Sequence, residues 1–342
     1  TNLLFSGLRS TNFAYVINGP FVRMTDITID SGGLDLRSTE GWVSGLNVRT
    51  GLVTLAGRDN LMENAVIFGS GQPLVLAVGT NNTMRNNTLF SFRSAFRQTG
   101  DDSSTILQNN IIVADGSSNE AFCIEIRGGV VLSDYNNFVN RNGAWIGNAN
   151  GNWEKLLYWQ RESGQDLHSL AHDPLFASEA GLDFHVQSTV GRYDGGGFVT
   201  DAQMSPMIDA GAPLTIYTNE LVPNGFRVNI GAFGNTAQAS KSLVTPWLLA
   251  VTMNDGGVIR GTNLLRWIYG AMDATNTIRL EYSANAGGSW TNIATGLSVG
   301  DESYLWDTTS AESSLDALWR LVLETDTNVV DETDTLFALR ND

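Results

Sequence analysis

The chain has 342 residues, 42% of them hydrophobic, which is enough to fill the cores of two ordinary domains or of one long solenoid. Its formal net charge of −16 opposes binding to nucleic-acid phosphates and to anionic membrane surfaces. No apolar run is long enough to cross a bilayer, so we expect neither nucleic-acid binding nor membrane insertion. The single cysteine, Cys123, excludes a disulfide framework within the chain.

A six-residue pattern recurs six times in the first 140 residues. The copies cover residues 24–29, 43–48, 62–67, 84–89, 107–112 and 134–139. The first four steps are 19, 19, 22 and 23 residues, and the last step, from Asn109 to Asn136, is 27. Each copy alternates and is rich in β-branched residues and Asn, which is typical of strands and not of helices. The repeat therefore predicts a right-handed parallel β-helix, in which equivalent strands stack about 4.8 Å apart.

Two kinds of position in the repeat indicate how the coils hold together. The last position is always aliphatic and predicts a buried interior column: Ile29, Val48, Ile67, Leu89, Ile112 and Val139. Asn recurs in the middle of the copies. Because Asn tolerates the left-handed backbone region and stacked Asn side chains can hydrogen-bond along a ladder, we expect bends there, joined by such a ladder.

A second strand follows about ten residues later in each coil. We place these strands at residues 35–37, 54–56, 75–77, 95–97 and 125–127, with the central residue pointing inward and its neighbours outward. The outward face then presents Arg37, Arg97, Glu125 and Arg127. After residue 140 the repeat stops, and a helix is predicted from Trp153 to about Ser163. Asn152 is its expected N-cap and Gly164 its stop.

Two stretches beyond the repeat resemble a known group of proteins. One contains Asn152-Trp153, Trp159-Gln160, Gly164-Gln165-Asp166, His168-Ser169 and Asp173-Pro174-Leu175-Phe176; the other runs from Ser205-Pro206-Met207-Ile208-Asp209-Ala210-Gly211 to Asn229-Ile230-Gly231-Ala232-Phe233-Gly234. They are similar to the C-terminal part of bacterial secreted right-handed β-helix proteins, which are often tethered to the cell surface. The resemblance covers about residues 20–242. It implies a β-helix outside the cytoplasm but no single activity, since the group includes lyases, epimerases and hydrolases.

Residues 243–342 form a second predicted unit of alternating strands separated by Gly and Asn turns. Residues 278–283, 287–290 and 304–307 resemble the fibronectin-type-III-like sandwich modules of microbial surface proteins, and residues 283–290 resemble an Asp-box turn. Both resemblances imply a structural accessory. We therefore expect an all-β protein with a β-helix over residues 1–242 and an antiparallel β-sandwich over residues 243–342. Since the chain opens with Thr1 and ends just after a predicted strand, we also expect a mature or excised piece of a longer protein.

The Arg-bearing face is the first candidate site. Arg37, Arg97 and Arg127 could bind the carboxylates of an acidic sugar chain in bidentate fashion, beside Glu125. The alternative is a solvated face on which Arg and Glu pair across the rungs for little energy. Gly100-Asp101-Asp102 resembles the paired carboxylates of polygalacturonase-type β-helix hydrolases, although the other motifs of that group are missing and the string also suits an ordinary turn.

Other chemistries find less support in the residues. A lysine-based lyase mechanism is disfavoured because no lysine precedes Lys155. Ca²⁺ held by Glu125 with Asp101 or Asp102 is conceivable, but no Ca²⁺-loop spacing supports it, and we expect no cofactor. His168 and His172 have a zinc-like spacing, yet their segment is predicted to be a loop and we interpret them as structural. We expect Cys123 to point outward as a half-buried, inert thiol.

We therefore predict an extracellular or cell-surface β-helix protein with a glycan-binding or structural, adhesive role, and we lean against an enzyme. Its expected partner is a polysaccharide or another surface glycan. One alternative is a lyase or hydrolase acting on an acidic glycan, with Arg97, Glu125 and Arg127 at the site and Asp101 and Asp102 beside it. A third hypothesis is a subunit of an extracellular filament that associates through the β-helix ends.

Overall fold

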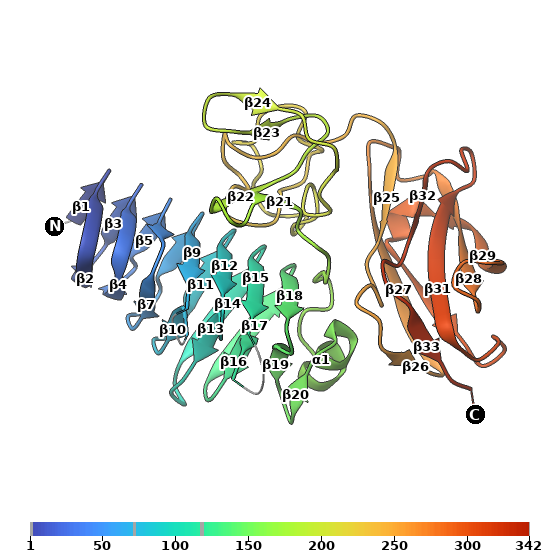
Figure 1. The fold of residues 1–342 in the computed structure, drawn as a ribbon, viewed down its shortest axis with the longest axis horizontal. Coiled ribbons are helices and arrows are strands. Elements are labelled where there is room, and N and C mark those ends of the chain that lie inside the picture. The colour runs from blue at the N-terminus through green and yellow to red at the C-terminus, as the bar shows by residue number, and fades with distance from the viewer. Residues whose placement is uncertain (1–2, 71–72, 117–119, 342) are drawn as a thin grey trace.

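The first half of the chain is a parallel β-solenoid of about six turns, as a computed structural model of residues 3–70, 73–116 and 120–341 shows. Figure 1 shows its coils stacked from the N-terminus toward helix α1 (Leu156–Ser163). One wall is a seven-stranded parallel sheet. Its strands, in spatial order, are β1 (Leu3–Ser6), β3 (Val22–Thr25), β5 (Trp42–Ser44), β8 (Leu61–Glu63), β11 (Asn82–Arg85), β14 (Ser104–Gln108) and β17 (Val130–Asp134).

The other two walls are continuous in the first coils and separate further on. The long strands β2 (Arg9–Pro20) and β4 (Thr28–Thr39) pair along their length and belong to both walls. The second wall continues with β6 (Asn47–Val48), β9 (Val66–Gly69), β12 (Thr88–Ser91), β15 (Ile111–Asp115) and β18 (Asn137–Arg141). The third continues with β7 (Gly51–Leu55), β10 (Val75–Ala77), β13 (Phe96–Gln98), β16 (Phe122–Ile126), β19 (Trp145–Asn148) and β20 (Asn152–Trp153), the last pair being antiparallel.

The predicted interior column and Asn ladder are both present. Ile29, Val48, Ile67, Leu89 and Ile112 face one another on successive rungs and are fully buried, as predicted. The sixth member was predicted wrongly: Ile112 is opposite Phe138, not Val139. Asn87, Asn110 and Asn136 form a buried hydrogen-bonded chain between coils. The residues at the preceding bends, such as Asn86 and Asn109, have φ of 52° and 56°.

The second predicted strand exists in every coil, but its register was partly wrong. Leu34, Val53, Val75, Phe96 and Ile124 form one inward column, and Leu36, Leu55, Ala77, Gln98 and Ile126 form another. Leu76, predicted to point inward, therefore points outward between Thr54 and Arg97. The alternation of Val75-Leu76-Ala77 is ambiguous because all three residues are apolar.

Helix α1 covers the C-terminal end of the solenoid and begins later than predicted. Its N-cap is Lys155 and not Asn152, which lies in β20, while Gly164 ends the helix in the left-handed conformation as predicted. The backbone N–H of Leu156 is capped by a distant residue, Asp255, at 2.7 Å. Because the capping carboxylate comes from the following unit of the chain, the local sequence could not place the start of α1.

Residues 174–242, which we call the cap segment, pack against the outer surface of the second wall. The segment is mostly irregular, with short hairpins β21 (Phe176–Ser178)–β22 (Asp183–Val186) and β23 (Arg192–Tyr193)–β24 (Phe198–Val199). Phe90 and Ile111 of the wall pack with Phe184 and Ile230 of the cap segment in one buried cluster. This covering explains why the strands of the second wall are apolar on both faces.

The C-terminal part is an antiparallel sandwich, which confirms the predicted fold class. One sheet contains β25 (Trp247–Ala250), β27 (Thr262–Gly270) and β30 (Ser303–Asp307). The other contains β26 (Val258–Ile259), β33 (Phe337–Leu339), β31 (Ser314–Leu323), β28 (Thr277–Ser283) and β29 (Thr291–Ser298), with β32 (Val330–Glu332) paired to β31 and a 3-10 turn at Val299–Asp301. Both sheets contribute to one core that includes Trp267 and Trp319. The division of the chain at residues 242 and 243 stays a prediction.

The solenoid and the sandwich meet through polar contacts around α1. Tyr158 Oη accepts a 2.8 Å hydrogen bond from the N–H of Val258, and Arg161 donates to Asn263 Oδ1 at 3.0 Å. His172 lies 3.0 Å from Asp334. Val251 and Ile268 of the sandwich join the apolar cluster of the cap segment. Among the described residues no helix is long and apolar enough to span a membrane.

Candidate functional site

Arg97, Glu125 and Arg127 do converge, as the rung spacing predicts, but they converge on each other. Glu125 accepts a hydrogen bond from Arg97 Nε at 2.7 Å on one oxygen and from Arg127 Nε at 2.6 Å on the other. The side chain of Glu125 is 6% exposed and that of Arg127 is 57% exposed. This geometry matches the alternative in which Arg and Glu pair across rungs, and it leaves only the outer side of Arg127 open to a ligand.

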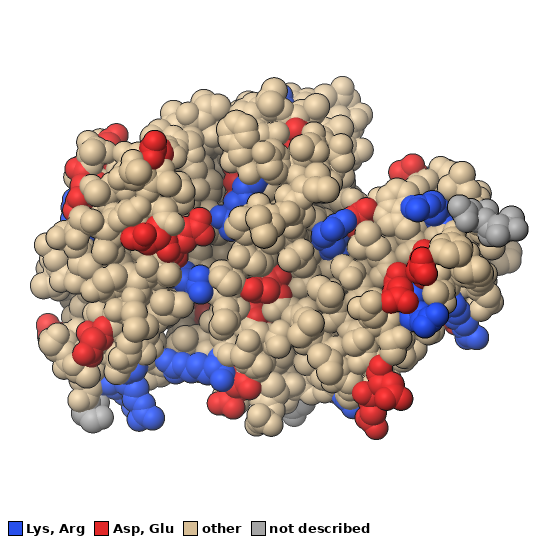
Figure 2. Space-filling view, turned by 180° about the vertical axis from the view of Figure 1, so that it is seen from behind, with Lys and Arg blue, Asp and Glu red and all other residues tan. Residues whose placement is uncertain are grey.

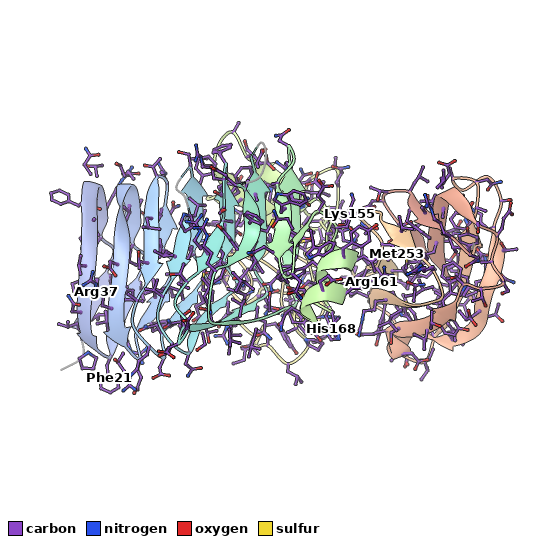
Figure 3. All side chains as sticks on the ribbon, turned by 90° about the horizontal axis from the view of Figure 1, so that it is seen from below. Phe21, Arg37, Lys155, Arg161, His168 and Met253 are labelled. Atoms are coloured by element: carbon purple, nitrogen blue, oxygen red, sulfur yellow. The ribbon has the colours of Figure 1, made fainter. Side chains whose placement is uncertain are left out.

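Arg37 does not belong to the same cluster. Its guanidinium lies 2.6 Å from Asp35 on its own strand. Along the third wall it is three rungs from Arg97, which is about 14 Å at the usual strand spacing. Figure 3 shows Arg37 at the N-terminal coils, far from the labelled residues around α1. The three arginines of the predicted substrate-binding set therefore form three ion pairs in two separate groups, one around Asp35 and one around Glu125.

Asp101 and Asp102 lie on an exposed turn between β13 and β14. The carboxylate of Asp101 borders Gly128, the residue after Arg127, so it is near the Arg97–Glu125–Arg127 cluster. In the view of Figure 2, basic and acidic side chains occur in small mixed groups, with no broad basic band.

The three histidines face three different carboxylates and do not form a zinc pair. His168 lies 2.6 Å from Asp134 and His185 lies 2.6 Å from Asp183, while His172 contacts Asp334. Within the described ranges, no group of three or more His, Cys, Asp or Glu side chains could hold a metal ion. Each histidine thus contacts a carboxylate of its own, and the structural interpretation of His168 and His172 stays a prediction.

Cys123 is fully buried, so its predicted outward, half-buried position is wrong. The side chain is fully buried, and its Sγ lies 3.5 Å from the carbonyl oxygen of Val139 on the opposite wall. Burial raises the pKa of the thiol to about 12, so it stays protonated at neutral pH. The inward–outward alternation fails here because Cys123 and Ile124 are both buried in the solenoid core.

One feature suited to a small ligand lies between the cap segment and the sandwich. It is a cavity of about 360 Å³, which we call the junction cavity. Its apolar lining includes Met204, Pro206, Ile208, Trp247 and Leu249. Its polar lining includes His172, Asp173, Asp209, Asp331 and Asp334. An apolar cavity with a few converging polar groups is the usual form of a ligand site.

A second hollow, of about 390 Å³, lies on the α1 side of the same junction. It shares His172, Asp173 and Asp334 with the junction cavity and adds Lys155 and Asp255. Figure 3 shows Lys155, Arg161 and Met253 together where α1 approaches the sandwich. The side chains of His172 and Asp334, which contact each other, therefore line both the junction cavity and this second hollow.

Two carboxyl groups of the junction cavity have opposite electrostatic environments. Burial raises the pKa of Asp331 to about 6, although its Oδ2 accepts a 2.6 Å hydrogen bond from the N–H of Ala250. Burial would also raise the pKa of Asp334, but hydrogen bonds from His172 and Asn254 lower it. In mildly acidic solution the cavity therefore offers a protonated and an ionised carboxyl group, the pair that general acid–base chemistry requires.

The raised pKa of Asp331 predicts a measurable pH dependence of stability. A carboxyl group with a raised folded-state pKa stabilises the fold below its unfolded pKa of 3.8, and that contribution is lost as pH rises through about 6. Asp331→Asn keeps an oxygen for the N–H of Ala250 but does not titrate. Relative to the wild type, we expect this variant to gain about 2 kcal/mol of unfolding free energy between pH 4 and pH 8, measured by urea unfolding. The prediction would be contradicted if the difference in unfolding free energy between the variant and the wild type were the same at pH 4 and at pH 8.

A comparison with protein-family models matches residues 38–211, just over half of the chain, to the family described as disaggregatase related. The chain belongs to the disaggregatase-related family. Comparison with curated proteins and with solved structures gave no match. The matched part of this disaggregatase-related protein contains most of the solenoid, α1 and one wall of the junction cavity, from His172 to Asp209. Trp247, Asp331 and Asp334 lie outside it.

Sequence reasoning missed the junction cavity of this disaggregatase-related protein. His172-Asp173 and Ser205 to Asp209 lie within the two stretches that carried the family resemblance, which was the only signal available. Asp331 and Asp334 stand in a run of acidic residues that resembles any solvated surface. No pattern in the sequence indicates that they contact residues some 160 positions earlier.

Proposed function

We propose that this chain is an extracellular or cell-surface β-helix protein that binds a neutral glycan in the junction cavity. The observation that carries the proposal is the cavity itself, whose lining combines Trp247 and aliphatic side chains with several carboxyl groups. Sugars present apolar C–H faces that stack on aromatic rings and hydroxyl groups that donate to carboxylates. The sandwich serves as a spacer or attachment module of the fibronectin-type-III-like kind.

The charge of the cavity supports a neutral ligand over an acidic one. Four aspartates and one histidine line it, so the carboxylates of a uronate chain would meet groups of their own sign. On the third wall, both arginines of the Arg97–Glu125–Arg127 cluster are already bound to Glu125. For these two reasons we propose a neutral glycan as the ligand, in place of the acidic sugar chain expected from the arginines.

A second candidate function, hydrolysis of the bound glycan, is supported by one specific observation. Asp331 and Asp334 line the same cavity and have pKa values shifted in opposite directions. Glycosidases use such a pair, one carboxyl group protonating the leaving oxygen and the other activating water or attacking the sugar. Self-association through the C-terminal end of the solenoid, in contrast, has no support, because α1 and its Trp159 cover that end.

The test is a binding assay with neutral and uronate-containing polysaccharides, by affinity electrophoresis and calorimetry. We expect neutral chains to bind and Leu243→Trp, which fills the cavity, to weaken binding by at least about tenfold. Arg127→Ala is the matched control and should leave binding within about twofold, since it alters only the third wall. Binding of uronate chains alone, lost in Arg127→Ala and retained in Leu243→Trp, would refute the cavity proposal.

Hydrolysis is followed in the same samples as new reducing ends. New ends that disappear in Asp331→Asn, while binding persists, would establish the second candidate function. Binding without new ends would leave the protein as a binder.

A further inference from the structure

Lys155 carries a cation that the fold leaves unpaired. It is the N-cap residue of α1, it is half-buried, and its side chain lines the second hollow. Among the described residues, its ammonium group has neither a hydrogen bond nor an ion pair. The guanidinium of Arg141, which lines the same hollow, is bound to Glu179 by two hydrogen bonds of 2.9 Å. The donors of Lys155 are therefore available to a molecule that enters the hollow.

The carboxyl groups that share this hollow with Lys155 are engaged by other donors. They accept hydrogen bonds from groups of their own surroundings: Asp173 from the N–H of Leu175 at 3.0 Å, Asp255 from the N–H of Leu156 at 2.7 Å, and Asp334 from Asn254 Nδ2 at 2.6 Å. Burial also raises the pKa of Asp255, against the charge of Lys155. A half-buried ammonium group without a partner loses part of its hydration, which an acceptor on a ligand can replace.

His172, which lines both the second hollow and the junction cavity, is held from two sides. Its backbone N–H donates to Asn137 Oδ1 at 3.0 Å, and its carbonyl oxygen accepts from Asn137 Nδ2 at 3.0 Å. Its Nε2 lies 3.1 Å from the carbonyl oxygen of Ala250, which can only accept, so Nε2 carries the hydrogen. The imidazole is thus fixed between the last coil and the sandwich, and the hollows beside it are formed before any ligand arrives.

The two hollows complement each other in size and in hydrogen-bonding character. At about 360 and 390 Å³, each lies near the lower end of the range of about 300–1,000 Å³ typical of small-molecule sites, and together they lie well inside it. The junction cavity offers Trp247 and carboxyl groups, and the second hollow adds the cationic donor Lys155. Because sugar hydroxyl groups both donate and accept, one chain can use the acceptors of the first hollow and the donor of the second.

We propose that the second hollow is a further subsite of the glycan site, in which Lys155 donates hydrogen bonds to the oxygens of a sugar chain that continues from the junction cavity. The proposal rests on the glycan-binding role above and narrows its ligand to oligosaccharides that are too long for the junction cavity alone. A short chain stays beside Trp247, and a longer one extends past His172 and Asp334 to Lys155. Lys155 then determines the preference for chain length.

The experiment measures Kd by calorimetry for neutral oligosaccharides of glucose, galactose and mannose, from the disaccharide to about the hexasaccharide. We expect the longest chains of the series that binds to bind at least about tenfold more tightly than the disaccharide. Lys155→Met, which keeps the length of the side chain, should weaken the long chains by about tenfold and leave the disaccharide within about twofold. Leu243→Trp, in contrast, should weaken both.

Two further variants show whether the ammonium group itself is responsible. Lys241→Met is the matched control, because it alters the only other lysine, whose ammonium lies 4.4 Å from the ring centroid of Phe198 in the cap segment. It should leave every Kd within about twofold. Lys155→Arg keeps a cationic donor and should restore most of the affinity for long chains, a rescue that mere damage to the start of α1 does not predict.

The possible failures are distinguishable. If the disaccharide binds but longer chains bind no more tightly, or if Lys155→Met and Lys241→Met have the same effect on long chains, the subsite is refuted and the glycan-binding role stands. If none of these oligosaccharides and none of the neutral polysaccharides binds, the glycan-binding role is refuted and the subsite with it.

Discussion

Asn110→Ala is expected to lower the free energy of unfolding by about 2–4 kcal/mol. The Asn110 side chain is fully buried and makes four hydrogen bonds to neighbouring coils. Its Oδ1 accepts from the backbone N–H and from Nδ2 of Asn87, both at 2.9 Å. Its Nδ2 donates to the carbonyl of Met84 at 3.0 Å and to Asn136 Oδ1 at 2.9 Å. Alanine would remove all four bonds and leave the buried backbone N–H of Asn87 without its acceptor, while Asn87 Nδ2 would keep only its bond to the carbonyl of Met62.

Urea unfolding followed by circular dichroism measures this loss as a shift of the transition midpoint at unchanged slope. Asn18→Ala is the control, because Asn18 lies exposed in β2 and its replacement should change stability by no more than about 0.5 kcal/mol. Equal midpoints for the two variants would show that the Asn ladder contributes nothing beyond what water can replace.

The sequence was most informative where the same contact recurs in every coil. A position that is aliphatic on five successive rungs has one structural explanation, and Ile29 to Ile112 do stack in the interior. The prediction failed at the last rung, where Asn136 and Asn137 are adjacent. Because two Asn residues are adjacent, the sequence does not decide which of them is equivalent to Asn110. The structure pairs Asn110 with Asn136. The ladder then ends on Ser169, a residue type that the repeat did not indicate.

Predictions about the site were correct only where they rested on that same rung geometry. The contact between Arg97 and Glu125 follows from their equivalent positions on adjacent coils. The junction cavity follows from no repeat, since it forms where the cap segment meets β25 and the loop after β32. Such contacts depend on how separate units pack, and hydrophobic periodicity carries no information about them. The same reason explains the helix boundary, which is set by the distant Asp255.

Asp166→Ala should be the most destabilising single change, with an expected loss of about 3–5 kcal/mol. The carboxylate of Asp166 is buried where α1 meets the last coil. It accepts hydrogen bonds from four side chains that belong to three segments: Trp159 Nε1 at 2.8 Å, Ser133 Oγ at 2.8 Å, Ser169 Oγ at 2.7 Å and Asn136 Nδ2 at 3.3 Å. Alanine would leave Trp159 Nε1 and the hydroxyl groups of Ser133 and Ser169 without this acceptor and would release Trp159 from the solenoid.

Hydrogen exchange can show whether Asp166→Ala loosens α1 in particular or lowers the stability of the whole fold. Because Asp166 joins Trp159 to Ser133 and Asn136, amides of α1 should lose protection from hydrogen exchange before those of β12 and β15 do. Asp166→Asn keeps one acceptor oxygen and should lose about half as much stability as Asp166→Ala. Asp102→Ala, at an exposed turn, is the control. If α1 kept its protection in Asp166→Ala, its attachment would depend instead on the apolar packing of Leu156 and Trp159, and the carboxylate would be dispensable.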